Sequence, residues 1–148
     1  MEAWKMPDKL KVLEALGAVF DDRIKLDEKN ESATCWSSDR VKQYTITYDI
    51  RNSAITSDDN SSHWQGRLGY PPIGVLMMLK ELPQDEVIGE ALKNIPWKEI
   101  NTKFKNDYTK TLALVYEIVK PQGVEEKALN HYMANVLELI EDKQYKKL

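Results

Sequence analysis

The sequence predicts an α+β fold: an N-terminal helix, then an antiparallel β-meander of three to four strands, then three to four C-terminal helices packed on one face of the sheet. Two observations support this prediction. Apolar residues tend to alternate with polar ones between positions 18 and 58, whereas before and after this stretch they recur at helical spacing. Strands and helices that are segregated along a chain in this way are typical of the α+β class.

The first helix is predicted between Pro7 and Gly17, because proline is favoured in the first turn of a helix and glycine just after the last. The clearest strand covers residues 41–50, where tyrosine and β-branched residues follow one another. We expect helices to cover the face that carries its tyrosines and water to reach the other face. The inner face holds Tyr44, Ile46, Tyr48 and Ile50, and the outer face holds Gln43, Thr45, Thr47 and Asp49.

The C-terminal half is predicted to be helical. The helix from 72 to 82 is apolar all round, which indicates burial on several sides, and a second helix follows Pro83. The longest helix is predicted from 96 to 119, and the sequence Lys120-Pro121-Gln122-Gly123 ends it. A last helix repeats apolar residues at four-residue steps from 124 to 140.

Composition limits the class of protein. With 148 residues the chain is expected to form a single domain, residues 1–148, whose core needs neither disulfide nor metal. The net charge of −3 gives no field that attracts nucleic acid or an anionic membrane. The single cysteine, Cys35, excludes a disulfide within the chain. The longest apolar run, Ile73–Leu79, is too short to span a bilayer, so we expect a cytoplasmic protein. We also expect no cofactor.

The stretch from Ser57 to Pro72 brings together acids, a histidine, an arginine and a tryptophan in one irregular segment, which leads straight into the apolar helix. A polar loop at the end of a buried helix is a place where a small protein easily builds a site. The candidate ligand-binding residues in this segment are Asp58, Asp59, His63, Trp64, Arg67 and Tyr70.

One hypothesis for this segment is an anion site. Glycines let the backbone approach a phosphate, the start of a helix offers free N–H groups, and Arg67 adds a planar fork of donors. Against it, Pro71 and Pro72 carry no N–H at the start of the helix, and neither glycine motif for phosphate binding is present. A tight turn between the sheet and the helix therefore explains Gly66 and Gly69 better.

A second hypothesis is a divalent metal site formed by Asp58, Asp59, Asn60 and His63. The calcium-loop pattern fails, because its sixth position holds His63 and its twelfth holds Gly69, where glycine and glutamate are required. Aspartate and asparagine at the end of a strand more often accept local backbone hydrogen bonds, so we expect no metal. His63 could also serve acid–base chemistry, but nothing in the sequence places a second catalytic group beside it.

Three other features have a structural interpretation beside a functional one. Cys35 and His63 suggest a nucleophile pair, but a cysteine in a predicted strand is expected to be buried and inert. The helix from 96 to 119 interleaves lysines with acids, which is typical of a solvated face and not of a helix that reads DNA. Trp97 belongs to the predicted core, whereas Trp64 either anchors a partner or folds over the edge of the core.

No catalytic motif with a specific spacing is present, so the sequence favours a binding or interaction protein without enzymatic activity. Its partner would be another protein or a second copy of the chain, and sheet edges and the C-terminal helices are the surfaces available for a homodimer. The alternative is a small-ligand (anion) binding protein or a small enzyme with its site in the 58–70 loop. Polar side chains that converge on a pocket would favour this alternative, and a flat apolar surface would favour the interaction protein.

Overall fold

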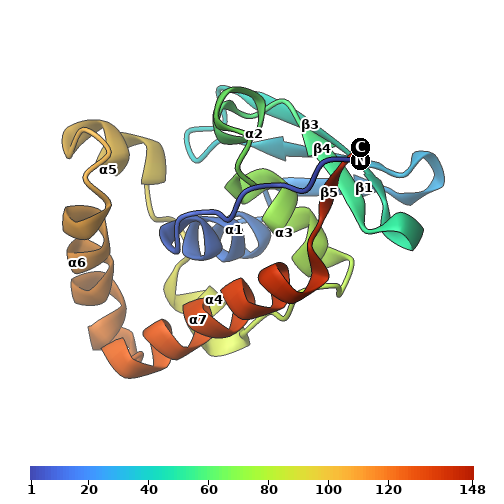
Figure 1. The fold of residues 1–148 in the computed structure, drawn as a ribbon. Coiled ribbons are helices and arrows are strands. Elements are labelled where there is room, and N and C mark those ends of the chain that lie inside the picture. Colours follow the sequence, from blue (N-terminus) through green and yellow to red (C-terminus); the bar gives the residue numbers. More distant parts are fainter.

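The computed structural model describes residues 1–148 and has the expected α+β architecture. Figure 1 shows a sheet with helices α1 (Leu10–Phe20) and α3 (Tyr70–Met78) against one of its faces. Helix α3 packs directly on the sheet and on α1, while α4 (Glu86–Ala91) and α7 (Glu126–Lys143) pack on α1 from the other side. The remaining helices are α2 (Asn60–Gln65), α5 (Trp97–Lys103) and α6 (Tyr108–Val119).

The sheet has five strands in the order β1-β2-β3-β4-β5. The first four form the predicted antiparallel meander, whereas β5 lies parallel to β4 and is one strand more than the sequence predicted. This strand has only two residues, both lysine, so it shows no alternation of apolar and polar positions. The strands are β1 (Ile24–Asp27), β2 (Ser32–Trp36), β3 (Gln43–Asp49), β4 (Ala54–Ser57) and β5 (Lys146–Lys147).

The inner face of β3 is the one that carries the tyrosines, as predicted. Ile46 and Tyr48 are buried there, and Tyr44 is partly buried at the end of the strand. Gln43 and Thr45 on the outer face are exposed. The alternation of the sequence therefore assigns the two faces correctly, and it places Tyr44 beside the helices.

Helix α1 does not end at Gly17, so the predicted C-terminus of this helix is wrong. The helix continues to Phe20, and Gly17 lies inside it. A Cβ atom at this position would stand 2.9 Å from Nε1 of Trp97, which is too close for a carbon. Glycine is therefore present at position 17 because the indole of α5 packs on the backbone of α1.

The helix predicted from 96 to 119 is interrupted, and α5 and α6 are separate helices. Lys105 and Asn106 between them adopt left-handed backbone angles, with φ of 52° and 61°. Asp107 then caps α6 by accepting a hydrogen bond from the backbone N–H of Lys110. Asparagine tolerates the left-handed conformation and aspartate is a common N-cap, so Asn106-Asp107 is a break signal that the apolar spacing concealed. The C-terminal helices therefore number five, α3 to α7, where the sequence predicted three to four.

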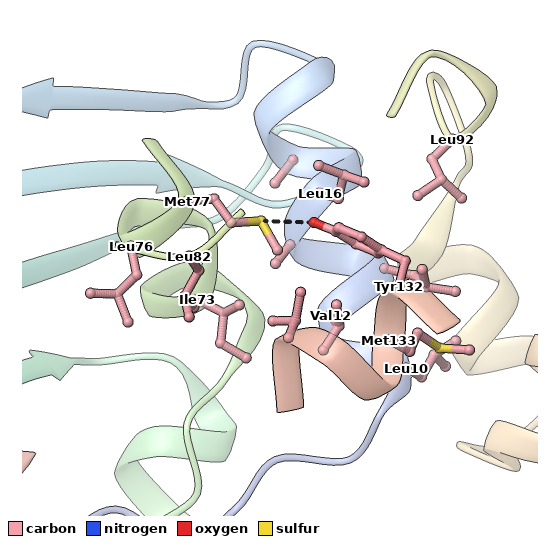
Figure 2. Close-up of a cluster of buried hydrophobic side chains, with 14 of the residues drawn as sticks. Leu10, Val12, Leu16, Ile73, Leu76, Met77, Leu82, Leu92, Tyr132 and Met133 are labelled. Atoms are coloured by element: carbon pink, nitrogen blue, oxygen red, sulfur yellow. Dashed lines mark hydrogen bonds between the residues drawn. The ribbon is translucent and has the colours of Figure 1, made fainter. Parts of the chain in front are cut away.

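The core is one continuous cluster of 34 buried residues, to which the sheet and helices α1 and α3 to α7 contribute. Figure 2 shows Tyr132 of α7 reaching between α1 and α3, where its hydroxyl approaches the sulfur of Met77 at 4.0 Å. The same hydroxyl donates to the carbonyl of Pro83 at 2.7 Å. The apolar helix α3 is accordingly buried, as predicted, and Met77 has no exposed surface. None of the helices is of the length and apolar character that crossing a bilayer requires.

Candidate functional site

The structure separates the six candidate residues of the 58–70 loop into three groups. The carboxylates of Asp58 and Asp59 accept hydrogen bonds from within the protein, while His63, Trp64 and Arg67 face solvent. Tyr70 alone lines a cleft, on the helix side of the sheet. The side chain of Asp58 accepts a hydrogen bond from the backbone N–H of Thr45 at 2.8 Å, which joins the end of β4 to β3.

Asp59 is the centre of a closed polar group that we call the Asp59 cluster, formed by Ser57, Asp59, Ser62 and Gly69. The Asp59 carboxylate, 4% exposed, accepts from the hydroxyl of Ser57 and from the backbone N–H of Ser62 at 3.2 Å, and so caps α2. The hydroxyl of Ser62 accepts from the backbone N–H of Gly69, also at 3.2 Å. A Cβ atom at Gly69 would overlap the Asp59 carboxylate. The cluster therefore fills itself and leaves no room for a ligand.

The other three loop residues lie on the outside of the molecule. The rings of His63 and Trp64 meet edge to face, with centroids 4.4 Å apart, and Trp64 is 76% exposed. The guanidinium of Arg67 donates to the backbone carbonyl of Met6 at 3.3 Å, and the Arg67 backbone pairs with Lys5. No three His, Cys, Asp or Glu side chains gather as metal ligands anywhere in the molecule.

Tyr70 lines a cleft of about 190 Å³ between the sheet, α1 and α5, which we call the Glu14 cleft. Four larger hollows lie on the surface, but none of them is lined by a buried charged side chain. The Glu14 cleft is lined by Lys11 and Glu14 of α1, Ser37, Ser38 and Lys42 of the β2–β3 turn, Tyr44, Asn60, Tyr70, and Trp97, Lys98, Asn101, Thr102 and Asn106 of the α5 region.

Glu14 is the most unusual residue of this cleft, because its carboxylate is only 2% exposed on a helix whose one other charged residue is Lys11. Lys11, one turn earlier, approaches its Oε2 at 3.3 Å, and the side-chain amide of Asn101 donates to its Oε1 at 2.7 Å. An isolated buried carboxylate is strongly unfavourable, and such partners are what make its burial possible. The amide from α5 therefore completes a site that α1 alone cannot form.

Lys11 stays charged beside Glu14. Burial by itself lowers the pKa of the Lys11 ammonium, but Glu14 and Tyr108 outweigh this effect and hold its pKa above 10.5. Its Nζ lies 5.3 Å from the centre of the Tyr108 ring, at the start of α6. The floor of the cleft thus contains an ion pair, and its lysine keeps its positive charge at neutral pH.

The wall opposite α5 is aromatic. The rings of Tyr44 and Tyr70 meet edge to face with centroids 6.3 Å apart, and the guanidinium of Arg23 lies 5.8 Å from the centre of the Tyr70 ring. Arg23 is itself buried and donates to the carbonyl of Trp36 at 3.0 Å. Burial raises the pKa of the Tyr70 hydroxyl, and it raises the pKa of the neighbouring Cys35 thiol to about 12. Cys35 is therefore buried and protonated, in agreement with the inert cysteine that the sequence predicted.

Helix α5 is attached to the rim of the cleft through the β2–β3 turn. The backbone N–H of Lys98 donates to the hydroxyl of Ser38 at 2.9 Å, and its ammonium pairs with Asp39 at 3.2 Å. Lys42, on the same turn, takes part in none of the ion pairs of the protein. The lining therefore holds two paired lysines and one unpaired lysine.

A protein-family model described as "Uncharacterised conserved protein UCP014422" matches residues 4–146. The chain belongs to this family. No curated protein and no solved structure matches the chain. The matched range includes the Asp59 cluster and all residues that line the Glu14 cleft.

Sequence reasoning missed most of the cleft residues in this family member. Lys11 and Glu14 are three positions apart in an apolar helix, and this pair was the one local signal. Asn101 lies 87 positions from Glu14, and nothing local indicates that the two side chains meet. The sequence predicts Tyr44 in a strand and Tyr70 in a loop, and no local pattern indicates that their rings meet.

Proposed function

We propose that this protein binds a small anionic molecule in the Glu14 cleft. The observation that carries the proposal is the convergence of polar side chains from α1, the β2–β3 turn, α3 and α5 on one cavity, with a buried carboxylate among them. Convergent polar groups in a cleft are the usual mark of a small-molecule site. The proposal keeps a binding role for the chain. It assigns this role to the Glu14 cleft, which shares only Tyr70 with the six candidate residues of the 58–70 loop.

The charge of the lining favours an anion. Lys11 is balanced by Glu14 and Lys98 by Asp39, whereas Lys42 has no acidic partner. One positive charge therefore remains at the rim of the cleft, on the exposed side chain of Lys42, and it attracts an anion that enters the cleft. A ligand with one negative charge would neutralise it.

The size of the cleft limits the ligand. Its volume of about 190 Å³ lies below the roughly 300–1,000 Å³ of pockets that hold drug-sized molecules. A nucleotide or a larger cofactor would extend beyond the cleft. A small organic acid or an inorganic anion fits this volume better.

The experiment is a thermal melt of the wild type and of two variants with a panel of phosphate, sulfate and small carboxylates. Lys42→Ala removes the unpaired lysine of the cleft, and Arg67→Ala removes an exposed cation of the 58–70 loop. A bound anion at a hundredfold excess over its dissociation constant stabilises the folded state by about 2.7 kcal/mol. We expect this stabilisation in the wild type and in Arg67→Ala, and its loss in Lys42→Ala.

Two outcomes would contradict the proposal. If no anion of the panel raises the melting temperature of the wild type, the cleft is not an anion site. If the rise disappears in Arg67→Ala and persists in Lys42→Ala, the site lies in the 58–70 loop instead. Lys29→Ala, in the exposed turn between β1 and β2, is the control for loss of one surface charge far from both regions in the sequence.

Self-association is the second candidate function, and one observation favours it. Strand β1 lies at the edge of the sheet and pairs only with β2, so its outer side offers a second copy of the chain a place to add a strand. Sedimentation velocity over a wide range of protein concentration tests this candidate. A single monomeric species at all concentrations would exclude it, whereas a dimer that Leu26→Pro abolishes would support it.

A further inference from the structure

We infer that the Glu14 cleft selects a small monocarboxylate that also carries a hydroxyl or amino group, with its carboxylate at Lys42 and its donor group at Glu14. This inference rests on the proposed function and narrows the class of ligand. It follows from the way the charged side chains of the lining are partnered, and from the aromatic wall that lies in the same cleft.

Glu14 keeps unused acceptor capacity. A carboxylate accepts roughly four hydrogen bonds, and Glu14 receives one from Lys11 at Oε2 and one from Asn101 at Oε1. The residue also lines the cleft, so a molecule inside the cleft can approach the remaining acceptor positions. A second anionic group beside Glu14 would be repelled, whereas a hydroxyl or an ammonium group would donate to it.

Lys42 is the residue that would bind the carboxylate of the ligand. Its turn is fixed by paired hydrogen bonds, in which the backbone N–H of Ser37 donates to the Lys42 carbonyl at 2.9 Å and the Lys42 N–H donates to the Ser37 hydroxyl at 3.0 Å. The acid of the same turn, Asp39, accepts from Ser37 and Val41 and pairs with Lys98. Asp39 is therefore engaged elsewhere, and Lys42 keeps its charge available.

The rings of Tyr44 and Tyr70 give the cleft an uncharged surface on which a ligand can pack. Burial raises the pKa of both the Tyr44 and the Tyr70 hydroxyl, so both remain neutral at physiological pH. Neutral rings pack against a short carbon skeleton, and their hydroxyl groups form hydrogen bonds without adding charge. No second unpaired cation lines the cleft, which disfavours dicarboxylates and inorganic phosphate as preferred ligands.

The test uses isothermal titration calorimetry with matched pairs of acids that differ by one group. Acetate is compared with glycolate and glycine, and propionate with lactate and alanine, while succinate and inorganic phosphate represent ligands with more negative charge. We expect the hydroxy or amino member of at least one pair to bind ten times more tightly than its unsubstituted partner, and more tightly than succinate or phosphate.

Two variants assign this discrimination to its residues. Glu14→Gln keeps the shape of the side chain but removes its charge and half of its acceptor oxygens, so the tenfold preference should fall below threefold. Lys42→Ala should weaken the substituted and the unsubstituted acids by the same factor. A variant that merely disturbs the fold would not remove the preference between paired acids without also weakening the binding of both. Thermal melts of Glu14→Gln and Lys42→Ala serve to check that both variants are folded.

The outcomes separate this inference from the proposed function. If unsubstituted acids or phosphate bind as tightly as hydroxy and amino acids, and Lys42→Ala abolishes their binding, the cleft is an anion site but the inferred ligand class is wrong. If the preference exists and survives in Glu14→Gln, the role given to Glu14 is wrong. If no acid of the set binds in a way that depends on Lys42, both the inference and the proposed function fail.

Discussion

The Asp59 cluster and the Glu14 cleft each bury one carboxylate, and the two regions differ in where its partners come from. Asp59 is satisfied by residues at most a few positions away, Ser57 and Ser62, within one continuous segment. Glu14 takes one partner from its own helix and another, Asn101, from 87 positions along the chain. Groups close in sequence can fold onto one another and leave no space, whereas groups carried by separate elements meet around a cavity. A local density of polar residues is therefore a better sign of a turn than of a site.

The largest expected effect is that of Gly69→Ala. The added Cβ overlaps the buried Asp59 carboxylate, which cannot move without losing its bonds to Ser57 and to the N-terminus of α2. Overpacking of a closed site and loss of an N-cap together destabilise a protein by about 3 kcal/mol. Urea denaturation measures this loss. A variant within about 0.5 kcal/mol of the wild type would show that the cluster is not closed.

Asp59→Ala should have a somewhat smaller effect, about 2 kcal/mol, because it removes the cap of α2 and leaves the Ser62 N–H and the Ser57 hydroxyl without an acceptor. The same change also makes room for a side chain at position 69. In the Asp59→Ala background, Gly69→Ala should therefore cost less than about 1 kcal/mol. Strictly additive losses in the double variant would mean that the two residues do not act as one unit.

The buried thiol of Cys35, beside the aromatic wall of the cleft, is tested at alkaline pH. Burial raises the pKa of the Cys35 thiol from 9.0 to about 12, so the folded chain keeps a proton that the unfolded chain releases. The corresponding stability is complete below pH 9 and is lost as the pH rises toward 12, at up to ~1.4 kcal/mol per pH unit. Cys35→Ala should reduce this slope between pH 9 and 10, before the tyrosines ionise in the unfolded chain. An unchanged slope in urea melts across this range would show that water reaches the thiol.

The smallest effects are expected on the outer side of the loop. His63 and Trp64 are exposed, and their rings contact each other. Replacing either with alanine should change the free energy of unfolding by no more than about 0.5 kcal/mol and should leave anion binding unaffected. If Trp64→Ala instead removed stabilisation by anions, the anion site would lie in the 58–70 loop and not in the Glu14 cleft.

The parts of the fold that the sequence predicts are those that depend on local periodicity. The alternation around Tyr44, Ile46 and Tyr48 gives the meander and the buried face of β3, and the all-apolar run at Met77 gives the burial of α3. Periodicity cannot reveal a contact between distant residues. It therefore missed the position of Gly17 under Trp97 and the pairing of β5 with β4.

The candidate site could be predicted only in part for the same reason. Of the loop residues, Tyr70 lines the cleft because α3 begins there and turns the side chain toward α1 and β3. Asp59 was chosen for its chemistry, yet its neighbours Ser57 and Ser62 were already present in the sequence to satisfy it. The second partner of Glu14, Asn101, lies 87 positions away, so the local sequence does not show how Glu14 is satisfied.

The pairing of β5 with β4 has a consequence for the time course of folding in the cell. Strand β4 and its antiparallel neighbours are synthesised before α2 to α7, and β5 follows only after all of them. At roughly 5–20 residues per second, translation of these helices takes several seconds. Throughout that interval the nascent meander exposes the backbone groups of β4 to other growing chains. Folding yield in the cell should accordingly respond to translation speed between β4 and β5.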